Sequence, residues 1–95
     1  MRVYRLFGGK ANQAGMSWTT VDPREIANPR DALGLPDENT GEWLAIGDLR
    51  DDVGVLHRQA LPLHGTEGGA PELLVPSPTV QIVISEVVRM ELRDE

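Results

Sequence analysis

Apolar and polar residues alternate in two stretches of the chain, and this alternation predicts β-strands. Residues 1–7 place Val3, Arg5 and Phe7 on one face of a strand, because successive side chains in a strand point to opposite faces. Residues 42–49 alternate in the same way. Both stretches contain β-branched or aromatic residues, which favour a strand over a helix.

Four further stretches also favour strands. They are residues 17–21, 55–63, 71–75 and 80–92. The last has the strongest pattern, with one parity shared by Val80, Ile82, Ile84, Val88 and Met90. Glu86 interrupts this apolar face, but the β-branched content still argues for a strand.

Two short helical turns are expected between the second and third strands. Asp22 followed by Pro23 suits an N-cap and a first helical position, and Glu25 stands where a capping box places an acid. A second turn is expected to begin near Pro29 and to end at Gly34, because glycine commonly closes a helix.

The length and composition indicate a single α+β domain spanning residues 1–95. A chain of 95 residues has the size of one domain. With 40% hydrophobic and 25% charged residues, its composition is that of a globular protein rather than a disordered one. The order of the elements predicts a mainly antiparallel, strongly bent sheet with one or two short helices early in the chain.

Composition and charge exclude several classes of function. The chain has no cysteine, which rules out disulfides, thiolate metal sites and a cysteine nucleophile. Its net charge of −6 repels phosphate backbones and argues against general nucleic-acid binding. No apolar run approaches the roughly 20 residues of a membrane span, and strand-like sequence directly after Met1 predicts that there is no signal peptide. A pocket for a small anion would need a local arginine or lysine.

The arginines and histidines give the first candidates for a site. Arg5 lies within the first strand and Arg58 within the fourth. Each is either a surface arginine with its head in water or a guanidinium that binds a phosphate or carboxylate, which its planar fork suits. His57 and His64 lack partners at a metal-ligand spacing, so no metal site is predicted.

The hydroxyl and carboxylate candidates follow glycine-containing loops. Ser17, Trp18 and Thr19 form either an ordinary strand with a core tryptophan or a site in which hydroxyls bind a ribose and the indole stacks on a flat cation. Glu72 follows a glycine-rich loop at residues 64–70 that we expect to be mobile. It is either an exposed strand-end glutamate or a carboxylate at a cleft edge that stabilises developing positive charge.

The order of Arg5, Ser17 and Glu72 resembles that of the R-S-E class of mono-ADP-ribosyltransferases. Longer segments resemble C-terminal toxin domains of bacterial polymorphic toxins of the Rhs and contact-dependent types. These segments are Val3–Gly9 (VYRLFGG), Ser17–Pro23 (SWTTVDP), Leu33–Pro36 (LGLP), Ala60–Gly65 (ALPLHG) and Gly68–Glu72 (GGAPE). The resemblance covers nearly the whole chain, and the ordered segments are more specific than the three residues alone.

The resemblance implies an ADP-ribosyltransferase-like fold, in which two small antiparallel sheets surround a cleft for NAD⁺. It implies that Arg5 anchors NAD⁺, that the segment of Ser17, Trp18 and Thr19 shapes the nicotinamide and ribose pocket, and that Glu72 is the catalytic glutamate. The full predicted NAD⁺-binding set is Arg5, Phe7, Gly8, Ser17, Trp18, Thr19 and Arg58, and the catalytic set is Glu72, Arg5 and Ser17.

One departure from the family pattern keeps the reaction open. Arginine-modifying members carry a second acid two residues before the catalytic glutamate, where this chain has Ala70. Transfer of ADP-ribose to an essential bacterial macromolecule is therefore expected, with NAD⁺ hydrolysis as the alternative and a non-catalytic β-rich interaction module as a second alternative. The resemblance also implies a protein acceptor, a cognate immunity protein, and delivery to the cytoplasm of a target cell.

Overall fold

The chain folds into strands joined by turns and short helices. A computed structural model describes residues 1–62 and 65–90. The elements in chain order are β1 (Arg2–Gly9), β2 (Ser17–Trp18), η1 (Pro23–Glu25), α1 (Pro29–Ala32), β3 (Asn39–Leu49), β4 (Leu56–Gln59), β5 (Pro71–Leu74), α2 (Pro78–Gln81) and β6 (Ile82–Arg89), where η1 is a 3-10 turn.

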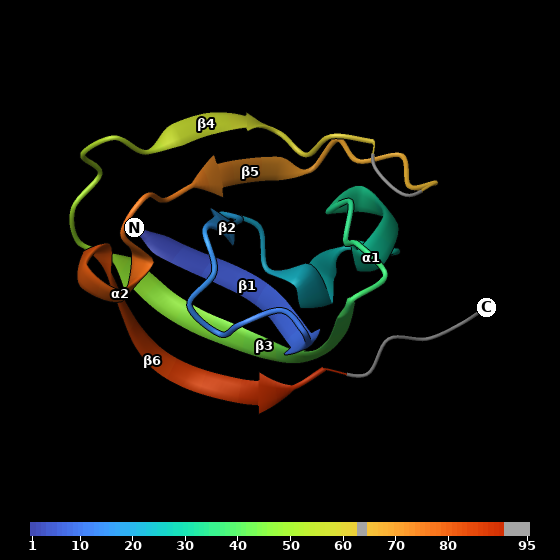
Figure 1. Cartoon of the computed structure of the whole chain (residues 1–95), viewed down its shortest axis with the longest axis horizontal. Coiled ribbons are helices and arrows are strands. Elements are labelled where there is room, and N and C mark those ends of the chain that lie inside the picture. The colour runs from blue at the N-terminus through green and yellow to red at the C-terminus, as the bar shows by residue number, and fades with distance from the viewer. Residues whose placement is uncertain (63–64, 91–95) are drawn as a thin grey trace.

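The strands form two small antiparallel sheets that face each other (Figure 1). The first has the order β1-β3-β6 and the second the order β2-β5-β4. Tyr4 and Thr19 form a single antiparallel bridge between the edge of β1 and the residue after β2, so the two sheets are joined through one sharp bend. The expectation of an α+β domain with two small antiparallel sheets is confirmed at this level, whereas the single bent sheet predicted from the order of the elements is divided into two.

The core lies between the two sheets. Its buried members come from both sheets and from the bend; they are Val3, Trp18, Ala45, Leu49, Leu73, Val75 and Ile82. A smaller cluster lies on the opposite face of the first sheet and consists of Leu6, Leu44 and Ile46, covered by Leu33 and Leu35 after α1. The predicted alternation in β1 and β3 therefore separates two apolar clusters on the two faces of one sheet.

The strand predicted at residues 80–92 differs from the structure in two ways. Val80 lies in α2 and its side chain is 78% exposed. In β6, Ile84 pairs with Gly47 while Glu86 pairs with Ile46, so Ser85 is an extra residue in a β-bulge.

The bulge changes the face to which the even-numbered residues of β6 point. Ile84 packs on the inter-sheet core, whereas Val88 packs on the outer cluster. The prediction of one continuous apolar face was therefore wrong, and the interruption at Glu86 marks the change of face. Leu92 lies outside the described residues.

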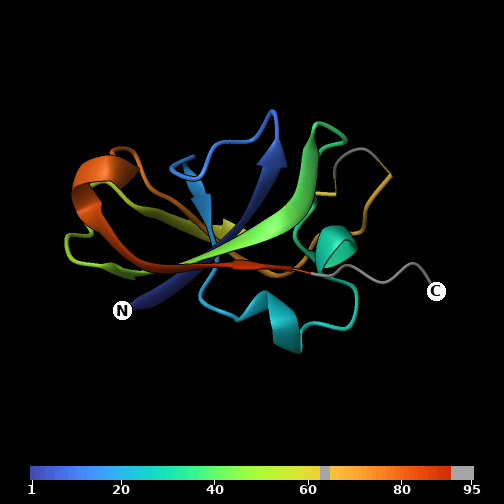
Figure 2. The same cartoon turned by 90° about the horizontal axis from the view of Figure 1, so that it is seen from below.

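Both α-helices are single turns at opposite ends of the molecule (Figure 2). α2 replaces the start of the predicted strand because Pro78 suits the first helical position and because Gln81 is held by polar contacts. The Gln81 amide donates to the carbonyls of Asp51 and Val53 at 2.9 Å each, and its oxygen accepts from the Ser77 N–H at 2.8 Å. In the described part of the chain, no helix is long and apolar enough to cross a bilayer.

The other predicted elements are present with changed bounds. The stretches at residues 17–21 and 55–63 form only the short strands β2 and β4, whereas β3 starts earlier than expected, at Asn39. Asp22 caps η1 as predicted, since its side chain accepts from the Arg24 N–H. Leu63 lies outside the described residues.

The loop before Glu72 is tied to α1. The Gly68 N–H donates to the Asp31 carbonyl at 2.9 Å and the Ala70 N–H to the Ala32 carbonyl at 3.1 Å. The Asp31 carboxylate accepts from the Glu67 N–H at 3.0 Å. The loop expected to be mobile spans residues 64–70, and within its described part Glu67, Gly68 and Ala70 are bonded to the helix in this way.

Candidate functional site

A cavity of about 460 Å³ lies beside the bend that joins the two sheets. This volume is within the range of about 300–1,000 Å³ that is typical of small-molecule sites. One part of its wall carries Arg5, Ser17 and Glu72. The rest is mainly apolar and includes Leu6, Leu33, Leu35, Pro36, Ala60 and Leu74. The cavity therefore offers a charged and hydroxyl-bearing region next to an apolar wall.

Arg5 extends from the centre of β1 to the loop before β2. Its Nε donates to the Asn12 carbonyl at 2.8 Å and its Nη1 to the Ser17 carbonyl at 2.9 Å. A guanidinium has five N–H donors, so donors remain beyond these two bonds. Among the described residues, no carboxylate forms an ion pair with Arg5.

Burial lowers the pKa of the Arg5 guanidinium from its ordinary value, but arginine stays protonated at neutral pH. The cavity wall consequently carries a positive charge whose contacts in the described chain are neutral carbonyls. Such a cation is suited to an anionic ligand, even though the net charge of the whole protein is −6.

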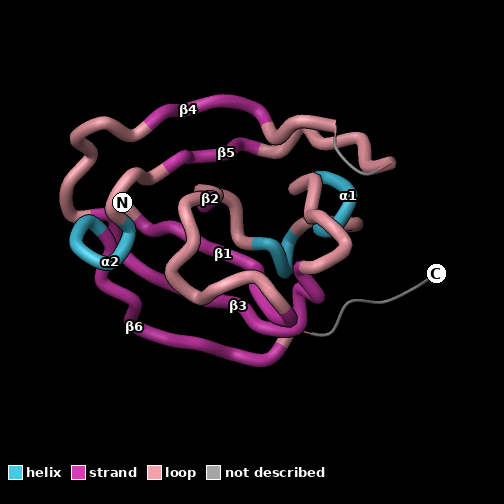
Figure 3. Tube along the Cα trace, in the orientation of Figure 1, coloured by secondary structure: helices cyan, strands magenta, loops and turns pink. Residues whose placement is uncertain are grey.

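Gly15 lets the loop between β1 and β2 lie against the guanidinium. This loop folds back beside β1 (Figure 3). A Cβ atom at residue 15 would lie 2.1 Å from Nη2 and 2.4 Å from Cζ of Arg5. The absent side chain of Gly15 therefore provides the space in which the Arg5 head is held.

Ser17 and Glu72 meet across the second sheet. β2 pairs with β5 so that Ser17 lies opposite Leu74 and Trp18 opposite Leu73. The Ser17 hydroxyl donates to Oε2 of Glu72 at 2.5 Å, a short distance typical of a hydrogen bond to a carboxylate. Glu72 is thus connected through Ser17 to Arg5, although the two charged side chains do not pair directly.

Arg58 contacts the same carboxylate from β4. Its Nε donates to Oε1 of Glu72 at 2.7 Å, and the two residues are direct partners in the β4–β5 register. Arg58 itself does not line the cavity. Its predicted role as a direct contact for NAD⁺ therefore has no support in the cavity wall.

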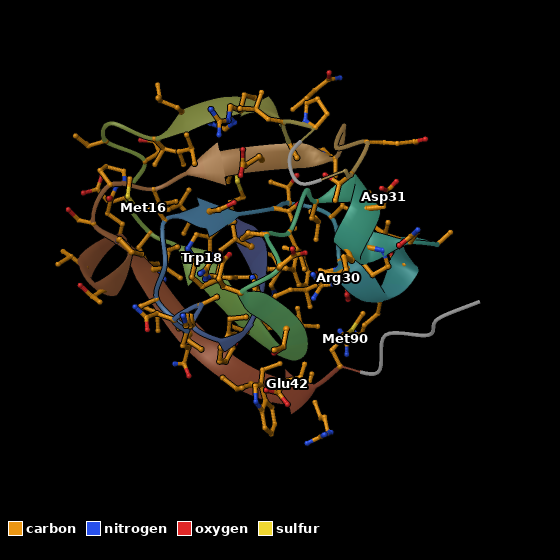
Figure 4. The ribbon with its side chains drawn as sticks, turned by 45° about the vertical axis from the view of Figure 1, so that its right-hand side comes forward. Met16, Trp18, Arg30, Asp31, Glu42 and Met90 are labelled. Atoms are coloured by element: carbon orange, nitrogen blue, oxygen red, sulfur yellow. The ribbon has the colours of Figure 1, made fainter. Side chains whose placement is uncertain are left out.

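Trp18 and Thr19 line the cavity but are also structural residues. The Trp18 side chain is 2% exposed and packs in the inter-sheet core, and Figure 4 shows it near the centre of the molecule. Its Nε1 donates to the Gly15 carbonyl at 2.7 Å. Thr19 is buried, and its hydroxyl accepts from the Val21 N–H at 3.2 Å. Trp18 is therefore a core tryptophan, which was one of the two interpretations of its sequence position. Its residue also forms part of the cavity wall.

Phe7 and Gly8 do not line the cavity. Phe7 packs against the inter-sheet core. Gly8 pairs with Ala11 through two backbone hydrogen bonds, and a Cβ at residue 8 would come within 2.1 Å of the Thr40 hydroxyl. Their predicted role as NAD⁺ contacts is not supported by this placement, because β1 lines the cavity at Arg5 and Leu6 but not at the two residues that follow.

Asn39 is a cavity residue that the sequence did not single out. It is 3% exposed, and its amide donates to the Leu6 carbonyl at 3.0 Å while its oxygen accepts from the Gly41 N–H at 2.9 Å. Arg30 of α1 donates to the Asn39 carbonyl. A lone asparagine at the start of a strand carries no distinctive sequence signal, so only the fold identifies it.

The described residues contain no cluster of three or more metal-ligand side chains, and His64 lies outside them. The cavity instead combines a guanidinium that has no carboxylate partner among the described residues, a hydroxyl and a carboxylate with an apolar wall. This combination can bind an anionic ligand and stabilise positive charge on it.

Comparison with known protein families, with curated protein sequences and with solved structures gave no match.

Proposed function

We propose that the chain is a toxin domain that cleaves NAD⁺ and transfers ADP-ribose to a protein of the target cell. The observation that supports this most strongly is that Arg5, Ser17 and Glu72 line one cavity and are linked by hydrogen bonds. These are the residues on which the R-S-E resemblance rests, and they come from β1, β2 and β5. The toxin would act in the cytoplasm of the target cell and be inhibited by an immunity protein.

The reaction breaks the C–N bond between nicotinamide and ribose. The bonding electron pair leaves with nicotinamide, which becomes neutral, and positive charge develops on the ribose C1, as in glycoside hydrolysis. Glu72 would stabilise this charge through its carboxylate, which is effective in a site partly shielded from water. No strong general acid is needed, because the leaving group is neutral.

Arg5 would bind the diphosphate of NAD⁺. Its guanidinium already has a fixed position through Asn12 and Ser17 and retains free donors, so a diphosphate oxygen can accept from it without displacing an acidic partner. This role is binding and orientation rather than chemistry. The apolar wall near Leu33 and Leu35 would contact the flat rings of the dinucleotide.

The second step depends on the nucleophile that attacks C1. A protein side chain gives an ADP-ribosylated acceptor and releases its proton, whereas water gives ADP-ribose and a proton. Position 70, which carries the second acid in arginine-modifying relatives of the class, is an alanine whose backbone is bonded to Ala32 and Ala60. This feature favours hydrolysis as the second candidate function, since no carboxylate there prepares an arginine acceptor.

The test is nicotinamide release from NAD⁺ by the purified protein and by Glu72→Gln. We expect Glu72→Gln to lower the rate by about 10²–10³-fold, because a charge-stabilising group is lost while its shape is kept. Glu67→Gln, the same change at an exposed glutamate nearby, is the matched control and should keep full activity. Expression of the wild type in bacteria should stop growth, and Glu72→Gln should not.

Two results would overturn the proposal. Equal turnover by Glu72→Gln and the wild type would show that the catalytic group lies elsewhere. A wild-type protein that neither binds NAD⁺ in calorimetry nor releases nicotinamide would instead be an interaction module. Mass spectrometry of a lysate incubated with NAD⁺ and the protein separates transfer from hydrolysis, since only transfer adds ADP-ribose to an acceptor.

A further inference from the structure

We propose that Arg58 is a positioning residue, which holds the Glu72 carboxylate at the cavity instead of contacting the ligand itself. The inference builds on the proposed function, because it concerns the group that would stabilise the ribose cation. It also changes the role that the sequence suggested for Arg58, from an anion contact to a partner of the catalytic carboxylate.

The β4–β5 pairing brings Arg58 to Glu72. The two residues are direct cross-strand partners, a relationship in which opposite charges on neighbouring strands attract each other. The Arg58 side chain is 42% exposed and the Glu72 side chain 12%. Glu72 lines the cavity and Arg58 does not, so the guanidinium contacts the carboxylate from its more exposed side.

The two oxygens of Glu72 have different partners. Oε2 accepts from the Ser17 hydroxyl and Oε1 accepts from Arg58 Nε at 2.7 Å. Rotation of the carboxylate would break at least one of these bonds, so the two contacts together define its plane. Each carboxylate oxygen can accept more than one hydrogen bond, which leaves Glu72 able to accept a ligand hydroxyl without losing either partner.

The position of Arg58 on an exposed edge strand predicts an effect on catalysis rather than on folding. Partly exposed ion pairs contribute little to stability, and all four residues of β4 are exposed. A change in the orientation of Glu72, by contrast, acts directly on the reaction, since a displacement of about 1 Å can lower a rate by about 10²-fold.

The first test is steady-state nicotinamide release by Arg58→Gln, Arg58→Lys and the control Arg50→Gln. Arg50 also forms an exposed ion pair, with Asp48 at 2.8 Å, and lies outside the cavity wall, so the control makes the same change in charge. We expect Arg58→Gln to lower kcat by about 10–100-fold with a change in KM below about twofold. Arg58→Lys should restore part of kcat, and Arg50→Gln should match the wild type.

The second test repeats Arg58→Gln in a Glu72→Gln background. If Arg58 acts only through the Glu72 carboxylate, removing Arg58 should not lower kcat further once that carboxylate is gone. The double variant should therefore be as slow as Glu72→Gln alone.

The outcomes separate this inference from the proposed function. A wild type that does not cleave NAD⁺ overturns the proposed function. With an active wild type, a higher KM at unchanged kcat in Arg58→Gln would show direct contact with NAD⁺ and overturn the positioning role. Wild-type values of kcat and KM in Arg58→Gln would also overturn the positioning role. So would a loss of kcat from Arg58→Gln that is as large in the Glu72→Gln background as in the wild type.

Discussion

Arg5 keeps a usable positive charge because its contacts are backbone carbonyls rather than carboxylates. The carbonyls of Asn12 and Ser17 fix the guanidinium without neutralising it. An exposed strand arginine and an anion-binding arginine have the same sequence signature, so residues 1–7 alone left both open. What favours anion binding is the loop that returns over β1 and places Gly15 against the Arg5 head.

This arrangement predicts that Gly15→Ala weakens NAD⁺ binding while the fold is kept. The new Cβ would overlap the guanidinium, and the flexible end of Arg5 would move. Gly15 is not among the glycines with a left-handed backbone φ, so alanine fits the backbone at this position. We expect calorimetry to show a Kd about tenfold higher, which corresponds to about 1.4 kcal/mol.

Gln13→Ala provides the control for this prediction. Gln13 is an exposed residue of the same loop, and its removal should leave the Kd for NAD⁺ unchanged. If Gly15→Ala binds NAD⁺ as tightly as Gln13→Ala, the position of the Arg5 head does not govern binding.

At the scale of elements, local sequence signals predicted the turns better than the sheets. Asp22 and Pro23 start η1 through capping and a fixed proline φ, which depend only on neighbouring residues. The bulge at Ser85 depends instead on how β6 pairs with β3. A period of two in the sequence cannot indicate where an extra residue is accommodated, so the change of face in β6 was missed.

The cap of η1 predicts a stability effect that depends on pH. Hydrogen bonds from the Arg24 side chain lower the pKa of Asp22 below its ordinary 3.8. The stabilisation from this charge is thus fully present above pH 3.8, and it is lost as the pH falls through the lowered pKa of Asp22. In urea unfolding at neutral pH, Asp22→Ala should cost about 0.5–2 kcal/mol.

Asp22→Asn separates the cap from the ion pair. Asparagine keeps the acceptor for the Arg24 N–H but loses the charge, so it should cost less than alanine at neutral pH. Its difference from the wild type should shrink in acid, because protonation removes the charge of Asp22 as well. A difference that grows as the pH falls would contradict the assignment of the charge effect to this pair.

At the scale of the whole molecule, stability rests on the contact between the two sheets. Val3 and Ala45 of the first sheet and Leu73 of the second belong to one buried cluster. Small domains bury a limited fraction of their surface, so one central side chain contributes a large part of the total buried apolar surface. The same packing brings β1, β2 and β5 together and thereby holds the cavity in shape.

Leu73→Ala should therefore lower the free energy of unfolding by about 2–5 kcal/mol, because Leu73 is 2% exposed and its truncation leaves a cavity between the sheets. Leu56→Ala is the matched control, since Leu56 on the adjacent strand β4 is 62% exposed. Its effect should stay within about 0.5 kcal/mol. Equal losses for the two variants in urea unfolding would contradict this position of the core.

The sequence by itself determined the strands at β1 and β3, the capped turn at Asp22 and the kinds of side chain available for chemistry. These follow from alternation, proline geometry and composition, which act over a few residues. Only the tertiary structure decided that Ser17 and Glu72, 55 positions apart, share a hydrogen bond. It also decided that Arg58 pairs with Glu72 and that Phe7 and Gly8 do not line the cavity. These placements depend on strand pairing and sheet packing across long separations, where local preference carries no information.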